Sequence, residues 1–321
     1  MSLVEYSKTY LPKYAEFVEI TKIHEEAHWH EGEAKLQQDV EQWKTGIITD
    51  DEKYFINSIL RFFTQSDVAV AREYHEIFIP AFKNNETRNM LTSFAGREGV
   101  HQRAYALLSD TLGFGEGFYE EFLEYEEMKE KYDYMLQMSN KSYHDLALSL
   151  VKQCLLEGVS LFGMFAMLLN FSRSGKMMGM SDINLWSIKD ESIHVRGNST
   201  LFRQFVEEHP RIVTDEFKKE AYEMARVLIA MEDKFIDRAF MLKASSGEGE
   251  NQITKDQVKQ YVRAVCDYRM TQMGFKPQFN VENPFEWLEW VTSSNMIENF
   301  FETNTVSYSK NSMIGSYAGG Y

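Results

Sequence analysis

The sequence has little cysteine, little proline and a deficit of positive charge. Its two cysteines, Cys154 and Cys266, cannot form a disulfide framework, so a reducing cytoplasm is the expected location. Only five prolines occur in 321 residues, which favours long uninterrupted helices because proline breaks a helix interior. The formal net charge of -15 argues against nucleic acid or an anionic membrane as a partner, since both attract lysine and arginine.

Long apolar runs are also missing. The most apolar stretch, residues 161–171, is too short to span a bilayer, and no apolar signal core follows Met1. The hydrophobic content of 44% is nevertheless ample for a buried core. We therefore expect a soluble, intracellular protein with neither a membrane nor a nucleic-acid partner.

Helical periodicity dominates the chain, and alternating strand patterns are scarce. The expected helices cover, with loose ends, residues 51–80, 85–112, 117–138, 141–172, 181–208, 214–243, 253–272 and 285–302. The breaks between them are too short to be interdomain linkers. This pattern predicts one all-α domain over residues 1–302. The small, polar residues 303–321 lack an apolar stripe and are expected to form a flexible tail.

Two segments, residues 98–101 and 191–194, carry a glutamate three positions before a histidine. On a helix, residues three apart share one face, so both side chains can reach the same metal pair. The helix before each segment carries a carboxylate in an apolar stripe, Asp67 or Glu157, where an unpaired charge would be costly to bury. Along the chain the order is therefore carboxylate, Glu-x-x-His, carboxylate, Glu-x-x-His. Ferritin-like bundles that hold two iron or manganese ions have the same order. The predicted ligands are Asp67, Glu98, His101, Glu157, Glu191 and His194.

A third segment, residues 25–28, has the same spacing but lies in a polar stretch without an apolar helical face. With 49 acidic residues and eight histidines, about one such spacing is expected by chance, and we interpret this one as that coincidence. Oxygen and imidazole ligands suit iron or manganese, and the absence of cysteine among them disfavours a thiolate site.

Bundles of this kind support several reactions, so the ligands alone do not define a function. Tyr105 lies four residues after His101, on the same helix face, where an oxidised cluster could remove its electron and proton. Taken alone, this tyrosine is better explained as a core residue with a satisfied hydroxyl.

The segments around these residues resemble the small subunit of class I ribonucleotide reductase. They are residues 65–67, 97–105, 156–158 and 189–194. Upstream, Trp29, Asp39 and Trp43 resemble the N-terminal part of that family, and residues 299–302 with Tyr308 resemble its C-terminal signature. The resemblance runs from Trp29 to Tyr308, which is nearly the whole chain.

Carried over by position, the resemblance implies a ferritin-like fold and two metal ions, which are iron, manganese or one of each. Their ligands would be Asp67, Glu98 and His101 for one ion and Glu157, Glu191 and His194 for the other, with Glu98 or Glu191 able to bridge. Tyr105 would store the radical, and Asp190 would link the metal-bound His101 to Trp29.

The resemblance further implies an electron and proton path through Trp29 and Tyr308 to a separate large catalytic subunit, which reduces ribonucleotides to deoxyribonucleotides. The C-terminal tail would dock that subunit, the chain would form a homodimer, and a flavoprotein activase is a further partner. The residues leave open whether Tyr105 or the metal pair holds the oxidising equivalent, and whether the oxidant is dioxygen or superoxide.

Two other classes of protein fit the ligand set. A di-metal oxidase or desaturase would need a substrate tunnel, but neither the Trp29, Asp190 and His101 set nor a tyrosine in a tail. A ferritin-like metal-binding protein without redox catalysis would have no reason to place Tyr105 beside the metals.

Overall fold

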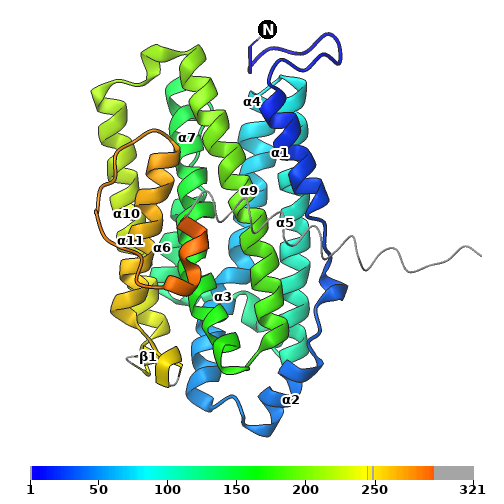
Figure 1. Ribbon diagram of the computed structural model, residues 1–321, viewed down its shortest axis with the longest axis vertical. Coiled ribbons are helices and arrows are strands. Elements are labelled where there is room, and N and C mark those ends of the chain that lie inside the picture. The colour runs from blue at the N-terminus through cyan, green and yellow to red at the C-terminus, as the bar shows by residue number, and fades with distance from the viewer. Residues whose placement is uncertain (1, 244, 248, 293–321) are drawn as a thin grey trace, which may run out of the picture.

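The computed structural model describes residues 2–243, 245–247 and 249–292, and within them the predicted all-α fold is confirmed. Most of the long helices run along one axis of the molecule (Figure 1). The α-helices are α1 (Ala15–Glu26), α2 (Gln37–Thr45), α3 (Asp50–Glu73), α4 (Ile79–Ala81), α5 (Asn85–Leu112), α6 (Glu126–Met135), α7 (Tyr143–Leu155), α8 (Leu161–Leu169), α9 (Met178–Glu208), α10 (Asp215–Ala239) and α11 (Lys255–Gln272).

Shorter elements connect or interrupt these helices. Two π-helical turns are η2 (Tyr74–Phe78) and η5 (Leu156–Ser160). The 3-10 turns are η1 (Glu31–Glu33), η3 (Glu116–Tyr119), η4 (Glu121–Glu124), η6 (Asn170–Ser174), η7 (Pro210–Ile212), η8 (Gly249–Asn251) and η9 (Glu286–Thr292). The strands β1 (Ser245–Ser246) and β2 (Ile253–Thr254) form one short antiparallel pair.

Local sequence signals explain where the main helices begin and end. Thr49 caps α3: its hydroxyl accepts the backbone N–H of Glu52, and the Glu52 carboxylate accepts the backbone N–H of Thr49. Helix α5 ends at Gly113, whose φ of 90° is a left-handed conformation that glycine adopts at little cost. These caps fix the two helices that carry the first half of the predicted metal site.

The two π-helical turns were not expected from the sequence. The predicted helices 51–80 and 141–172 are present, but η2 interrupts the first and η5 the second. A π turn holds one residue more than an α turn, so it changes the direction in which the following side chains point. Glu157 lies inside η5, and Tyr74 begins η2. Both turns therefore shape the centre of the bundle.

The structure also corrects other expected boundaries. Residues 15–26 and 37–45, which the expected helices did not include, form α1 and α2, because each segment buries side chains against the bundle. The expected helix 117–138 is instead η3, η4 and the shorter α6, and the helix expected to reach residue 243 ends at Ala239. Of the expected helix 285–302, residues 286–292 form η9, and Phe285 precedes it outside any helix. Residues 293–302, which include the segment 299–302, lie outside the described residues, as do Tyr308 and the tail 303–321.

Four helical segments form the centre of the molecule: α3, α5, α9 and the continuous stretch from α7 through η5 to α8. Each packs on at least two of the others, and α1, α10 and α11 pack against this group (Figure 1). One segment, Tyr143–Ser174, is long and apolar enough to cross a membrane, but its most apolar window is 100% buried inside the protein. Such burial is normal for the core helix of a helical bundle.

Candidate metal centre

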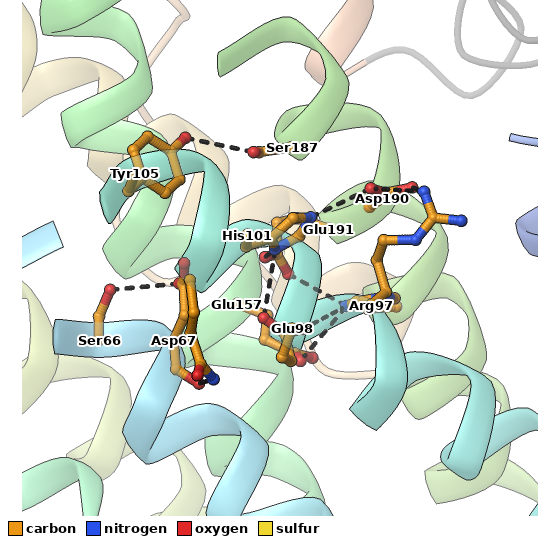
Figure 2. Close-up of polar contacts among 12 residues, drawn as sticks. Ser66, Asp67, Arg97, Glu98, His101, Tyr105, Glu157, Ser187, Asp190 and Glu191 are labelled. Atoms are coloured by element: carbon orange, nitrogen blue, oxygen red, sulfur yellow. Dashed lines mark hydrogen bonds and ion pairs between the residues drawn. The ribbon is translucent and has the colours of Figure 1, made fainter. Parts of the chain in front are cut away.

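The six predicted ligands meet in the middle of the four central segments. Figure 2 labels all of them except His194. Asp67 comes from α3, Glu98 and His101 from α5, Glu157 from η5, and Glu191 and His194 from α9. None is more than 1% exposed to solvent. The polar side chains therefore converge in a place that water does not reach.

The ligand atoms form two overlapping groups, and within each group all lie within 4.8 Å of one another. The first group is Asp67, Glu98, His101 and Glu191, and the second is Glu98, Glu157, Glu191 and His194. Glu98 and Glu191 belong to both groups, which is the position that a bridging carboxylate would occupy. This arrangement has the form of a two-ion site.

Several atoms in the cluster lack the hydrogen bonds that buried polar atoms normally make. They are Asp67 Oδ2, Glu98 Oε1, both carboxylate oxygens of Glu191, and His194 Nδ1. His194 Nδ1 lies 3.0 Å from Glu98 Oε1, but the two are not aligned for a hydrogen bond. Orphaned lone pairs that face one another are what cation ligands require, and oxygen with imidazole nitrogen suits iron or manganese. The residues present fit a di-metal cofactor.

The electrostatics point in the same direction. Burial raises the pKa of Asp67 well above its usual value, and burial raises the pKa of Glu157 to about 7. Burial also disfavours the charged form of Glu98, but His101 and His194 outweigh it and lower the pKa of Glu98 to about 2. The four carboxylates of the ligand set therefore carry more negative charge than its two histidines can neutralise. Bound cations would replace the protons that otherwise balance this charge, so metal loading is linked to proton release.

A hydrogen-bonded chain leads from the cluster to Trp29. The indole N–H of Trp29 donates to Asp190 Oδ2 over 2.7 Å, and His101 Nε2 lies 3.1 Å from the same oxygen. The rings of Trp29 and His101 stack with centroids 5.7 Å apart. Asp190 therefore contacts both His101 and Trp29, which is the arrangement of these three residues that the resemblance implies.

Tyr105 is fully buried, one turn from His101, and its ring packs edge-on against Phe63 with the ring centroids 4.4 Å apart. Its hydroxyl lies 3.2 Å from Ser187 Oγ (Figure 2). The same hydroxyl lies 3.3 Å from Asn184 Oδ1. Burial raises the pKa of this phenol well above its usual value, so the group is neutral. The tyrosine is thus held by α9 through neutral partners, in an apolar pocket that excludes water.

Sequence reasoning missed four residues around the cluster. Arg97 Nη1 lies 3.3 Å from Asp190, and the Tyr74 hydroxyl donates to Glu157 Oε1 over 2.7 Å. Asn198 Nδ2 donates to the other Glu157 oxygen over 2.8 Å. His24, from α1, lies against His194. A signal for His24 exists in the sequence, since Phe17, Ile20 and His24 form the buried face of α1.

The third Glu-x-x-His segment, residues 25–28, contributes no side chain to either ligand group among the described residues. Glu25 and Glu26 are exposed at the end of α1, and His28 follows in the connection toward Trp29.

Comparison with known proteins decides between the classes that such a site allows. The model of the family "Ribonucleotide reductase, small chain" matches residues 8–284. The chain belongs to this family. It is 35% identical to the probable ribonucleoside-diphosphate reductase small subunit 376L of Invertebrate iridescent virus 6, over 99% of this chain and 98% of the viral one. It is 26% identical to the ribonucleoside-diphosphate reductase subunit beta of Chlamydia pneumoniae, over 88% of this chain and 84% of the chlamydial one.

Solved structures share the fold. The R2 subunit from Clostridium botulinum superposes with a TM-score of 0.79 at 19% identity and covers 91% of this chain and 94% of its own. The dimanganese(II)-NrdF of Streptococcus sanguinis superposes with a TM-score of 0.74 at 15% identity and covers 92% of this chain and 99% of its own.

The protein is accordingly the small subunit of a class I ribonucleotide reductase, an oxidoreductase that acts in the reduction of ribonucleotides to deoxyribonucleotides. The family and the buried carboxylate and histidine cluster together indicate a di-metal cofactor. The oxidase and metal-storage alternatives find no support among these relatives.

Proposed function

We propose that six residues of this small subunit bind two metal ions, iron, manganese or one of each. They are Asp67, Glu98, His101, Glu157, Glu191 and His194. When bound, the pair supplies the oxidising power for one-electron chemistry. The chain's own side chains bind the ions, exclude water and hold the groups that give up an electron. The dimanganese neighbour from Streptococcus sanguinis supports manganese as one choice of metal.

The observation that carries the functional proposal is the chain from His101 through Asp190 to Trp29. Asp190 accepts hydrogen bonds from both rings, so it fixes the His101 orientation and is placed to take the indole proton when Trp29 loses an electron. A metal-storage protein needs no oxidisable side chain in this position. The path continues, in our proposal, through Tyr308 to the large catalytic subunit.

Tyr105 is proposed to store the oxidising equivalent between turnovers. Its apolar surroundings and its distance from solvent would protect a neutral phenoxyl radical, and Ser187 and Asn184 keep the hydroxyl oriented. Residues 303–321 are proposed to dock the large subunit. A homodimer is proposed by analogy with the yeast neighbour, whose structure is described as the Rnr4 homodimer. Action in the cytoplasm, and a flavoprotein activase as a further partner, complete the proposal.

Electron paramagnetic resonance of the protein reconstituted aerobically with iron or with manganese tests this function. The iron-loaded protein is expected to give a tyrosyl radical signal that Tyr105→Phe abolishes, because phenylalanine has no hydroxyl to oxidise. Tyr261→Phe is the matched control: Tyr261 is buried but belongs to α11, outside the cluster. A coupled manganese signal that survives Tyr105→Phe would assign the oxidising equivalent to the metal pair. Loaded protein without either signal would contradict the proposal.

A further inference from the structure

The two ring nitrogens of His194 have different surroundings. Nδ1 faces the cluster, 3.0 Å from Glu98 Oε1 and 3.3 Å from Glu191 Oε2, and has no hydrogen-bond partner. Nε2 points the other way and lies 3.1 Å from Nε2 of His24. A histidine that offers its Nδ1 lone pair to a metal carries its proton on Nε2. His194 must therefore donate this proton to His24.

The partner ring can accept only if its own proton is on the other nitrogen. His24 Nδ1 lies 2.8 Å from Ser93 Oγ, which is placed to accept that proton. The contacts thus define one direction for the whole chain, from His194 to His24 to Ser93. His24 is 1% exposed, and the ring of Phe94 packs against both histidines, with centroids 5.1 Å from His24 and 4.4 Å from His194. Packing and hydrogen bonding therefore hold both rings in place.

The other histidine of the cluster is held differently. His101 Nε2 faces Asp190, a carboxylate, whereas His194 Nε2 faces a neutral imidazole. A carboxylate acceptor increases the basicity of a ligating histidine, and a neutral acceptor does so less. His101 is thereby the stronger electron donor to a bound cation.

The two carboxylates that belong to a single ligand group also differ in their hydrogen bonds. Asp67 belongs only to the group with His101, and Glu157 belongs only to the group with His194. Both oxygens of Glu157 accept hydrogen bonds, from Tyr74 over 2.7 Å and from Asn198 over 2.8 Å. The Asp67 carboxylate has one hydrogen-bond contact, Ser66 Oγ at 3.4 Å from Oδ1, and its Oδ2 has none. Hydrogen-bond donors partly neutralise the negative charge of a carboxylate, so the carboxylate attracts a metal ion less strongly.

We propose that His24 is a positioning residue for His194, and that its neutral ring makes the His194 half the weaker of the two metal positions. This inference rests on the proposed di-metal site and adds an order of loading to it. The ion beside His101 binds first, and the ion beside His194 binds second. His24, which lies one residue before the chance Glu-x-x-His segment, sets the affinity of the second step.

Anaerobic titration of the metal-free protein with Mn²⁺, with free Mn²⁺ counted by electron paramagnetic resonance, measures both steps. The unaltered chain is expected to bind two ions per chain in two unequal steps. His24→Leu removes the acceptor and should weaken the second step by about 10- to 100-fold while the first step stays unchanged. His24→Gln should restore it, because an amide oxygen can accept from His194 and its NH₂ can donate to Ser93. Diffraction from crystals soaked with less than one Mn²⁺ per chain should give an anomalous peak beside His101 first.

Two controls separate positioning from general damage. His144→Leu removes a half-buried histidine that pairs with Glu220 and lies outside both ligand groups, and it should change neither step. Asp190→Asn is the mirror variant and should weaken the first step, since it removes the charged acceptor of His101. Thermal melting of each metal-free variant reports on folding.

Distinct results would overturn this inference. Equal weakening of both steps by His24→Leu, a glutamine variant as weak as the leucine variant, or a first anomalous peak beside His194 would each contradict it. Two-step binding that His24→Leu leaves untouched would contradict only the role of His24. An unaltered chain that binds no Mn²⁺ would contradict the di-metal site itself.

Discussion

Replacement of Glu98 with alanine is expected to remove both metal ions, although it deletes a single ligand. Glu98 belongs to both ligand groups, with Oε2 3.2 Å from His101 Nδ1 and Oε1 3.0 Å from His194 Nδ1. Even changes behind the ligands of a metal site typically cost 10- to 100-fold in affinity, so loss of a shared ligand should cost more than about 100-fold. Metal content after reconstitution and desalting, determined by elemental analysis, measures this effect.

Two further variants sharpen the test. Glu98→Gln keeps the side-chain volume but removes the charge, and it should also lose metal, because the cluster needs anionic ligands. Glu25→Gln makes the same chemical change in the third Glu-x-x-His segment, where the side chain is exposed at the end of α1, and should retain two ions per chain. Full occupancy with unchanged affinity in Glu98→Ala would show that the cluster is not the metal site.

Replacement of Trp29 with phenylalanine is expected to separate radical storage from radical use. The phenyl ring keeps the packing against His101 and Trp186, but it lacks the N–H that donates to Asp190 and is much harder to oxidise. Metal content and the Tyr105 radical should persist. Formation of deoxyribonucleotide with the large subunit should fall on the order of 100-fold or more, which corresponds to about 2.7 kcal/mol in the activation free energy.

Trp43→Phe is the matched control for this substitution. Trp43 lies in α2, where its ring packs against Phe114 rather than against Asp190, so turnover should stay close to that of the unaltered chain. Normal turnover in Trp29→Phe, with the radical intact, would remove Trp29 from the transfer path.

The ligand set was accessible from the sequence because its signals are local. A spacing of three residues places a glutamate and a histidine on one helical face, and a carboxylate in an apolar stripe stands out because burial of its charge is costly. The same logic predicts the extent of α5 and, apart from its first three residues, that of α9, because their apolar faces repeat over many turns. The structure brings these helices together, and with them Asp67 and Glu157.

The surroundings of the ligands were not accessible because they depend on distant contacts. His24 and His194 are 170 residues apart, and only the packing of α1 on α9 brings them together. The polar end of α1 also hid its apolar face, so the helix itself was missed. The turns η2 and η5 lie inside ordinary helical patterns, yet they direct Tyr74 and Glu157 toward each other. Helix propensity describes single residues and cannot indicate where packing inserts a π turn.

We propose that this chain, when loaded with two metal ions, supplies the oxidising equivalent for ribonucleotide reduction. The most direct test is the rate at which its large subunit forms deoxyribonucleotide from a ribonucleoside diphosphate, with the metal-loaded small subunit, the metal-free small subunit or neither. We predict turnover only with the loaded chain, in proportion to its metal content. Turnover that is the same with the metal-free chain, or absent with a fully loaded chain that carries its radical signal, would contradict the account.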